Sequence, residues 1–138
     1  MKKKEQSKKD ILTKEQRFAF CEMMSGKNIF LTGEAGTGKS FVTEAFIEEC
    51  EKKGKNLLVT APTGIAAINV GGATLHKTFQ IGLEPHIGKT PVKRIPEVVD
   101  TAEIIIIDEI SMCRIDLFDR VARTIIASEE RSGKHKQL

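Results

Sequence analysis

The stretch FLTGEAGTGKS, residues 30–40, decides the fold that this sequence predicts. Gly33, Gly38, Lys39 and Ser40 match the pattern G-x-x-x-x-G-K-[ST], with an apolar run before it and an amphipathic segment after it. Glycines let backbone N–H groups converge on phosphate oxygens with no Cβ in the way, and the N-terminus of a helix adds further unpaired N–H groups. The stretch therefore predicts a phosphate-binding loop between a strand and a helix.

The same pattern predicts a role for individual residues of the loop. Lys39 is expected to reach the β- and γ-phosphates of ATP, and the Ser40 hydroxyl to bind Mg²⁺. The residues expected to contact the nucleotide through this loop are Gly33, Glu34, Ala35, Gly36, Thr37, Gly38, Lys39 and Ser40. A glycine-rich turn with an incidental lysine is the alternative, and both the spacing and the flanking segments count against it.

A second chemical signal is the acidic pair at the end of IIIIDE, residues 104–109. Four consecutive isoleucines are typical of a strand buried on both faces of a parallel sheet. A carboxylate at the end of such a strand can hold the water shell of Mg²⁺, and we assign this role to Asp108. An ATPase must also deprotonate a water molecule, which a nucleotide kinase does not need, and Glu109 is the expected general base. The alternative is that the pair caps the next helix, which Ser111 could also do.

Segments with helical and strand patterns alternate along the chain. We expect helices over 11–26, 40–54 and 116–128, two short helices within 63–82, a brief helix over 97–101, and strands over 28–33, 55–62 and 102–109. In the first helix, Thr13 and Gln16 predict a capping box. Phe18, Cys21 and Met24, with Phe20 and Met23 flanking them, supply the expected apolar side. The alternation predicts an α/β domain with a parallel sheet flanked by helices and with ligands at the carboxyl ends of the strands.

The composition fits one domain without a membrane span. The chain has 138 residues, of which 40% are hydrophobic and 30% charged, and its formal net charge is +3. No window approaches the roughly 18 apolar residues of a spanning helix, and the start lacks the apolar region of a secretory signal. We therefore expect a cytoplasmic protein, associated with the nucleoid if bacterial. Cys21, Cys50 and Cys113 stand singly, which predicts buried reduced thiols and not disulfides or a zinc site.

Three segments in this order resemble the front half of the Pif-family helicases, relatives of RecD in superfamily 1: GEAGTGKS, TAPTGIAAINVGGATLHKTF and IIIIDEISM. The resemblance runs from about Leu12 to Phe118, and the middle segment is the specific one, because many families share phosphate loops. It implies a RecA-like P-loop NTPase fold, with ATP and Mg²⁺ as cofactors and single-stranded DNA as partner. The implied activity is ATP hydrolysis coupled to translocation in a 5′-to-3′ DNA helicase, with Lys39, Asp108 and Glu109 as catalytic residues and Ser40 and Asp108 on Mg²⁺.

The resemblance also implies roles outside the phosphate loop and the acidic pair. The segment LTKEQ is similar to the adenine-reading element of the family, so Gln16 is implied to bind the base, in competition with its capping role. The residues implied to contact the backbone of single-stranded DNA are Pro62, Thr63, Gly64, Thr74, His76 and Lys77. Hydroxyls, N–H groups and a basic side chain suit phosphate oxygens without selecting a sequence. For His76, a satisfied core position is the alternative.

The family pattern continues past this sequence with another strand and a second RecA-like domain that carries an arginine finger. We therefore expect an incomplete RecA-like domain over 11–127, truncated before the next strand of its sheet. A disordered lysine-rich tail is expected over 1–10, with a weak phosphate-binding arm as the alternative, and a polar, frayed tail over 128–138. Little or no hydrolysis is expected from this chain alone, and an open sheet edge favours self-association. A non-catalytic nucleotide- and DNA-binding module, or another P-loop ATPase, is the alternative function.

Overall fold

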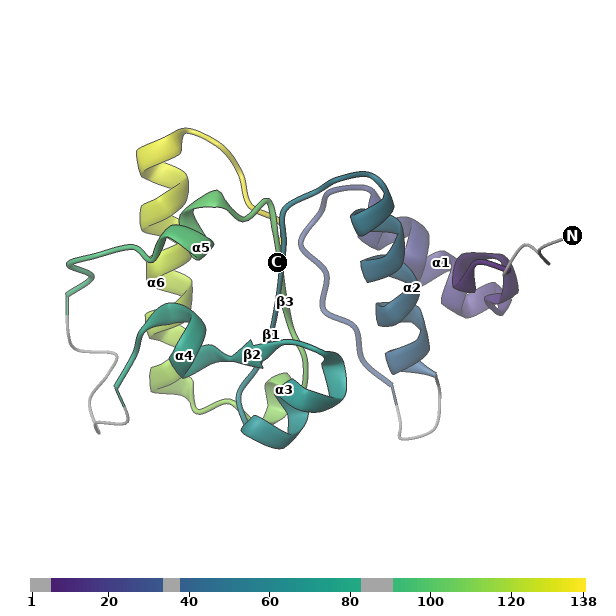
Figure 1. The fold of residues 1–138 in the computed structure, drawn as a ribbon, viewed down its shortest axis with the longest axis horizontal. Helices are drawn as coiled ribbons and strands as arrows, with labels where there is room; N and C mark the ends of the chain where they lie inside the picture. Colours follow the sequence, from purple (N-terminus) through teal and green to yellow (C-terminus); the bar gives the residue numbers. More distant parts are fainter. Residues whose placement is uncertain (1–5, 34–37, 83–90) are drawn as a thin grey trace, which may run out of the picture. The chain divides into compact units, whose positions relative to one another are not determined.

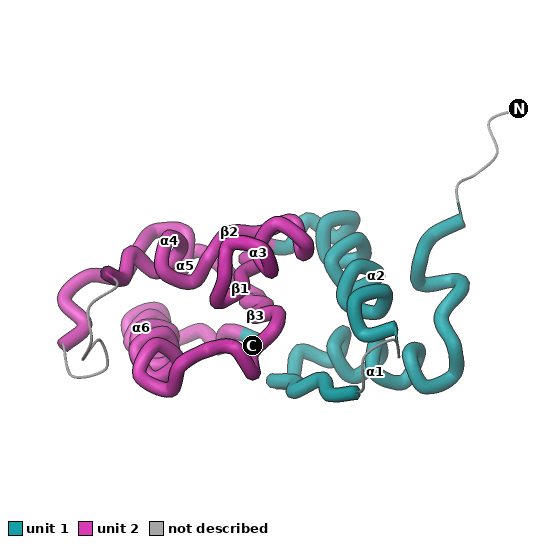
Figure 2. The backbone as a smooth tube through the Cα atoms, turned by 90° about the horizontal axis from the view of Figure 1, so that it is seen from below, with its two compact units in different colours: residues 1–55, 137–138 teal, residues 56–136 magenta. Residues whose placement is uncertain are grey.

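The computed structural model describes residues 6–33, 38–82 and 91–138. They form two compact units, 1–55 with 137–138 and 56–136 (Figure 2). Unit 1 contains the 3-10 helix η1 (Lys8–Ile11) and the helices α1 (Lys14–Met24) and α2 (Lys39–Lys52). Unit 2 contains a sheet and the remaining helices. None of the helices in the described ranges is long and apolar enough to cross a membrane.

Helix α1 begins with the capping box that the sequence predicts. The Thr13 hydroxyl accepts a hydrogen bond from the Gln16 amide at 3.3 Å, and the Gln16 Oε1 accepts one from the Thr13 amide at 2.9 Å. These two bonds satisfy amides that have no partner within the helix. The helix ends before Gly26, whose φ of +84° is a conformation that glycine adopts without steric cost.

The centre predicted for the apolar side of α1 was wrong, because the flanking residue Met23 is the one that is buried. Met23 is the buried residue of this helix, whereas Phe18 is 70% exposed and Cys21 is also exposed. The Gln16 side chain donates to the carbonyl of Gly38, the residue before α2, so this face of α1 is turned toward α2. Positions 16 and 23 are seven residues apart and share a face, so Met23 and not Phe18 lies on the inner side.

Helix α2 buries the residues that its spacing predicts. Val42, Ala45, Phe46 and Cys50 follow the 3.6-residue period and are at most 2% exposed. The helix ends at Lys52, shortly before Gly54, which has a φ of +68°. The apolar face of α2, together with Leu12 and Met23, supplies the buried hydrophobic side chains of unit 1.

The strand expected over 28–33 is absent from the secondary structure, so this prediction was wrong. Residues 27–33 carry no helix or strand, and Phe30 is 75% exposed. The Ile29 amide donates to the Leu138 carbonyl at 2.9 Å, and the Leu138 amide donates to Asn28 Oδ1 at 3.1 Å. A strand needs a neighbour along its length to complete its hydrogen-bond ladder, and one residue at the end of the chain does not supply it.

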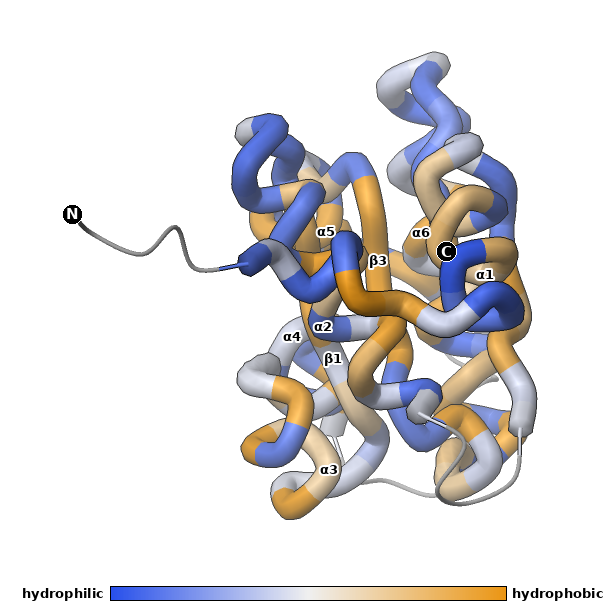
Figure 3. The backbone as a smooth tube through the Cα atoms, turned by 90° about the vertical axis from the view of Figure 1, so that its right-hand side faces the viewer, coloured by the Kyte–Doolittle hydropathy of each residue, from blue (hydrophilic) through white to orange (hydrophobic). Residues whose placement is uncertain are grey.

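Unit 2 is built on a three-stranded parallel sheet in the order β2-β1-β3, with helices packed against it. Its strands are β1 (Leu57–Ala61), β2 (Ala73–Thr74) and β3 (Ile104–Ile107). The short strand β2 was not predicted, because two residues give no periodic signal. Strand β3 is the hydrophobic stretch labelled in Figure 3, and Ile104 and Ile105 are 5% and 1% exposed. Since neighbouring residues point to opposite faces, both faces are covered here, as the isoleucine run predicts.

The helices of unit 2 cover this sheet. They are α3 (Gly64–Val70), α4 (Leu75–Phe79), α5 (Glu97–Thr101), the 3-10 helix η3 (Ile110–Met112) and α6 (Ile115–Ser132). Helices α4, α5 and α6 lie on the same side of the sheet (Figures 1 and 2). Leu75, Val99 and Val121, one from each of these helices, are fully buried. The fold is therefore the predicted open α/β arrangement.

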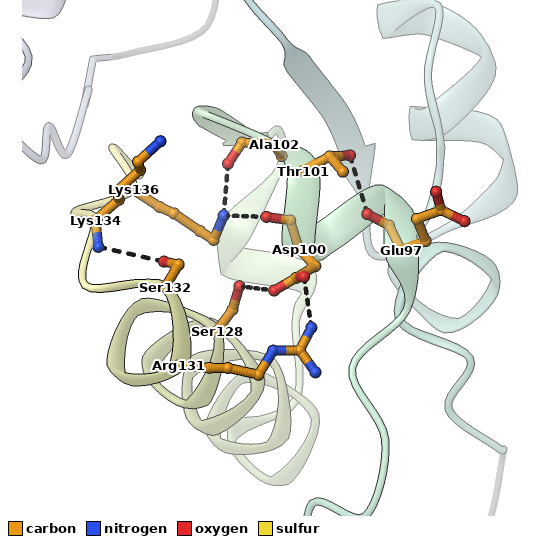
Figure 4. Close-up of polar contacts among 9 residues, drawn as sticks. All are labelled: Glu97, Asp100, Thr101, Ala102, Ser128, Arg131, Ser132, Lys134 and Lys136. Carbon is orange, nitrogen blue, oxygen red and sulfur yellow. Dashed lines mark hydrogen bonds and ion pairs between the residues drawn. The ribbon is translucent and has the colours of Figure 1, made fainter.

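The frayed C-terminal tail predicted over 128–138 was wrong. Helix α6 continues to Ser132, and Lys136 beyond it is only 5% exposed. The Lys136 ammonium donates to the carbonyls of Asp100 and Ala102 at 2.8 and 2.7 Å (Figure 4). These carbonyls lie at the C-terminal end of α5, where backbone acceptors lack helical partners and favour a cation. Composition alone cannot reveal this long-range partner.

The Asp100 carboxylate joins the ends of α5 and α6 in the same cluster. It accepts a hydrogen bond from the Ser128 hydroxyl at 2.7 Å and pairs with the Arg131 guanidinium (Figure 4). The hydrogen bond from Ser128, followed by that from Arg131, lowers the pKa of Asp100. Because the folded pKa lies below the unfolded pKa, the carboxylate stabilises the fold above the unfolded value of about 3.9 and loses this effect as the pH falls through the folded value.

We expect Asp100→Asn to lower the melting temperature at pH 7, and the difference from the unsubstituted chain to shrink in acid. Thermal melts between neutral pH and about pH 3 measure this, because Asp100 is then titrated in the unsubstituted chain alone. Asp119→Asn is the control, since it removes only an exposed pair with Arg123. A difference that stays constant across this pH range would contradict the assigned role.

Candidate active site

Unit 1 brings together the two ends of the predicted phosphate loop. Gly38 is the residue before α2 and has a φ of +83°, which favours glycine. The Lys39 ammonium donates to the Gly33 carbonyl at 2.5 Å, so Lys39 lies across the ends of the loop. The predicted nucleotide contacts Glu34, Ala35, Gly36 and Thr37 lie outside the described residues.

The first turn of α2 presents the groups that a phosphate needs. Lys39 and Ser40 are both exposed there. Gly38, the residue before the helix, has no side chain that could cap it. The first amides of α2 therefore need another hydrogen-bond acceptor. A helix N-terminus with free amides and an adjacent ammonium favours an anion. The described part of the loop is therefore suited to a phosphate group.

Gln16 has the capping role and also contacts the residue at the end of the phosphate loop. Its Oε1 completes the capping box of α1, while its Nε2 donates to the Gly38 carbonyl at 3.4 Å. A Cβ at Gly38 would lie 2.2 Å from that Nε2, so the close approach depends on the glycine. The capping role is confirmed, and Gln16 also lies beside the loop. Adenine contact remains a prediction.

Unit 2 places the other predicted residues at one edge of its sheet. Strand β1 pairs with β3 through Thr60 and Ile107, and with β2 through Ala61 and Thr74. All three strands are parallel, so the segments that leave them start at the same carboxyl edge. The DNA-side residues 62–64 and 74–77 and the acidic pair 108–109 are brought together at this edge.

The acidic pair follows β3 directly. The Asp108 amide continues the ladder by donating to the Thr60 carbonyl at 2.9 Å, and Asp108 is half-buried. Glu109 is exposed and has a φ of +54°, an uncommon conformation for a residue other than glycine. It precedes η3 but forms no side-chain cap with it, and α6 begins later, after Arg114. The described contacts do not support the capping alternative, and the turn carries the Glu109 side chain into solvent.

Thr63 and Thr74 have structural roles that the sequence analysis missed. The Thr63 hydroxyl accepts from the Ala66 amide and caps α3, and the Thr74 hydroxyl accepts from the Lys77 amide and caps α4, both at 3.2 Å. A threonine just before a short helical pattern is a readable cap signal. Each hydroxyl accepts in the cap and keeps its own proton for another acceptor. Capping and contact with a DNA phosphate are therefore compatible.

The remaining DNA-side residues differ in exposure. Lys77 and Gly64 are exposed, whereas Pro62 and His76 are half-buried. His76 therefore lies neither in the core nor fully in water. Behind this edge, the buried Thr60 hydroxyl donates to the Ile106 carbonyl at 2.7 Å and ties β1 to β3. This bond holds the strands that carry Pro62 and Asp108.

The three cysteines are free thiols in the structure, and the predicted burial holds for one of them. Cys50 is fully buried in α2, Cys113 is half-buried, and Cys21 is exposed. Burial raises the pKa of the Cys50 and Cys113 thiols, which keeps them protonated. No group of three or more His, Cys, Asp or Glu side chains that could hold a metal ion occurs within the described ranges.

Comparison with known proteins agrees with this arrangement. The model of the PIF1-like helicase family matches residues 11–137. The chain belongs to the PIF1-like helicases. The ATP-dependent DNA helicase PIF1 of Danio rerio is 37% identical over 134 residues, which cover 88% of this chain and 20% of that protein. The ATP-dependent DNA helicase RRM3 of Saccharomyces cerevisiae is 36% identical over 135 residues, covering 89% and 19%.

Solved structures of Pif1 helicases share the fold. Unliganded Pif1 from Bacteroides sp is 40% identical, with a TM-score of 0.70, over 87% of this chain and 28% of that chain. Bacteroides Pif1 bound to single-stranded DNA is 41% identical, with a TM-score of 0.68, over 87% and 28%. A complex of Bacteroides Pif1 with ADP-AlF4 is 42% identical, with a TM-score of 0.66, over 87% and 29%. The PIF1-like chain described here spans about a fifth of the length of the two curated relatives above.

Proposed function

We propose that this chain is the ATP-binding, DNA-contacting N-terminal part of an ATP-dependent 5′-to-3′ DNA helicase. In the whole enzyme, ATP hydrolysis would drive translocation on single-stranded DNA. The observation that carries the proposal is the carboxyl edge of the sheet in unit 2. There the acidic pair follows β3, the Pro62 segment follows the neighbouring strand β1, and the Thr74 segment follows β2. Membership of the PIF1-like helicases supports this function.

Nucleotide binding is supported by the first turn of α2. Lys39 and Ser40 are exposed beside amides that no side chain of Gly38 caps, and Gln16 adjoins the same glycine. A similar Pif1 structure contains ADP-AlF4, which extends the proposal to ATP here. The Ser40 hydroxyl at this turn is a proposed Mg²⁺ ligand, and the ion would neutralise charge that develops on the phosphates.

Single-stranded DNA is the proposed second ligand. The cap hydroxyls of Thr63 and Thr74, the exposed Gly64 and the exposed Lys77 ammonium offer donors to phosphate oxygens. Such donors bind a backbone without reading its bases. The similar Bacteroides Pif1 was solved with single-stranded DNA. Binding to this face would weaken steeply with salt, because each phosphate contact releases counterions.

Glu109 is the proposed general base, and its substitution tests the enzyme assignment. Hydrolysis by this chain alone is expected to be slow, because a transition-state arginine accounts for a factor of about 10³ or more. Glu109→Gln should lower single-turnover hydrolysis by a further factor of about 100 while leaving ATP affinity unchanged, because the amide keeps the shape and cannot take a proton. Rapid-quench assays with excess protein measure the step.

Glu103→Gln is the matched control for Glu109→Gln. Glu103 precedes β3, at the opposite end of the strand, and accepts a hydrogen bond from the Asn56 amide. We expect it to leave hydrolysis unchanged. Equal rates in the Glu109→Gln variant and the unsubstituted chain would show that Glu109 is not the base and would favour a non-catalytic binding module.

A further inference from the structure

The lysine-rich N-terminal segment, which the composition predicts to be disordered, packs on α2 in its described part. Ser7 and η1 lie against that helix, where Ser7, Lys8 and Lys9 each contact a glutamate of α2. The Lys8 ammonium is 2.7 Å from Glu44 Oε2, the Lys9 ammonium is 2.9 Å from Glu49 Oε2, and the Ser7 hydroxyl donates to Glu48 Oε1 at 2.9 Å. All of these residues belong to unit 1.

The acidic residues of α2 form a surface that matches this segment. Glu44 and Glu48 are four residues apart and share a helix face, and Glu49 adjoins them. We call these three residues the acidic face of α2. Lys52 joins the network from the same helix, with its ammonium 3.2 Å from Glu48 Oε1 and 3.3 Å from the Ser7 hydroxyl. Three ammonium groups thus meet three carboxylates, and their charges cancel.

The protonation of the partners agrees with these contacts. Hydrogen bonds to Glu44 and Glu49 raise the pKa of Lys8 and Lys9, respectively. The Ser7 hydroxyl, followed by Lys52, lowers the pKa of Glu48. Each group is therefore held in its charged form. At the other end of the segment, Leu12 is 7% exposed and anchors the chain in the core of unit 1.

The lysines of these pairs remain accessible to water, and so does Glu44, whereas the Glu49 side chain is only 12% exposed. The side chains of Lys8 and Lys9 are 41% and 39% exposed, and that of Glu44 is 49% exposed. Ion pairs of this kind contribute little individually and are screened by salt. While they are formed, the two lysines are occupied by carboxylates and are not free to bind phosphates.

We propose that Ser7–Ile11 is an ionic clasp on the acidic face of α2, and that single-stranded DNA competes with this face for Lys8 and Lys9. The clasp stabilises the helix that carries Lys39 and Ser40 at its other end. DNA that draws the lysines away releases the segment. The contacts that form the clasp do not depend on the proposed helicase function, whereas the choice of DNA as the competitor does.

A charge-swap cycle tests the clasp itself. Lys8→Glu and Glu44→Lys should each lower the melting temperature by about 2 to 4 °C at low salt, and the double variant should recover most of the loss. At about 0.5 M salt the differences should nearly vanish. Lys14→Glu is the control, because Lys14 is exposed in α1 and forms no ion pair among the described residues. Losses that simply add in the double variant would overturn the clasp.

Hydrogen exchange of the peptide over residues 6–13 tests the competition. An oligo-dT strand of about 20 nucleotides should accelerate exchange there at least threefold in the unsubstituted chain. The effect should be much smaller in the Lys8→Glu/Glu44→Lys variant, whose segment is docked but has lost one of the two lysines for which DNA competes. If DNA protects residues 62–77 while residues 6–13 stay unchanged, the competition is refuted and the proposed function stands.

Heparin separates failure of the clasp from failure of the proposed function. If the oligonucleotide binds nowhere on the chain, the helicase proposal fails, and heparin then decides whether a polyanion can open the clasp. Faster exchange over residues 6–13 with heparin would support the clasp. Unchanged exchange with heparin would overturn it.

Discussion

Replacement of Lys39 by alanine is expected to weaken ATP binding about 100-fold, which corresponds to about 2.7 kcal/mol. The ammonium is the cationic group that this chain holds beside the amides of the first turn of α2. Charge-assisted hydrogen bonds to phosphate are among the strongest single contacts in binding sites. In the structure, Lys39 donates to the Gly33 carbonyl, so a bound phosphate would have to replace that acceptor.

The fold should survive the Lys39→Ala change, because Lys39 is exposed and its described side-chain contact is one hydrogen bond. Isothermal titration with Mg·ATP measures the affinity, and a thermal melt without nucleotide confirms that the variant is folded. Lys53→Ala is the matched control, since it removes an exposed lysine from the other end of the same helix. An unchanged affinity for Mg·ATP in the Lys39→Ala variant would show that the nucleotide does not bind at the first turn of α2.

Gly72→Ala is expected to destabilise unit 2 by about 2 to 3 kcal/mol. A Cβ at Gly72 would lie 2.2 Å from the Val59 carbonyl oxygen and 3.0 Å from Val59 Cγ1. The contact is with the backbone of the central strand, which cannot move aside without disturbing β1. The pairing between β1 and β2 should therefore be lost or displaced. Thr74, which lies in β2, should move with its strand.

Thermal or denaturant unfolding of Gly72→Ala measures this effect. The expected loss corresponds to a fall in melting temperature of about 10 °C. Gly64→Ala is the control, because a Cβ there meets nothing within 4 Å and Gly64 begins a helix. It should be neutral or slightly stabilising. If the Gly72→Ala and Gly64→Ala variants have the same melting temperature, the Gly72 turn does not approach β1 as closely as described.

Local signals in the sequence were sufficient for much of the fold and for the strand that precedes the acidic pair. The capping box at Thr13 and the buried face of α2 depend on residues a few positions apart, and both were predicted correctly. The phosphate loop and the acidic pair are also short-range patterns. Spacing along the chain determines such features, so no knowledge of distant contacts is needed.

Features that depend on distant partners could not be predicted in the same way. Which face of α1 is buried depends on the element it packs against, and its contact with Gly38 joins residues 22 positions apart. The burial of Lys136 depends on carbonyls at the end of α5, 34 and 36 positions away. The segment before the phosphate loop reads as a strand locally, yet the described residues supply little for it to pair with.

The docking of Lys8 and Lys9 is an intermediate case. A run of lysines by itself indicates a solvated tail. The row of glutamates on α2 is also visible in the sequence, at spacings that place them on one helical face. Only the combination of the two signals points to an ionic contact, and nothing in either segment alone selects the other as its partner.

The central claim is that the first turn of α2 binds the phosphates of ATP, and amide NMR of the chain titrated with Mg·ATP tests it most directly. The account predicts that the largest shift changes occur at the amides of Gly33, Gly38, Lys39 and Ser40. Saturable shifts at these positions, lost in Lys39→Ala, would support the claim. No saturable shifts, or the largest shifts outside the loop and first turn of α2, would contradict it.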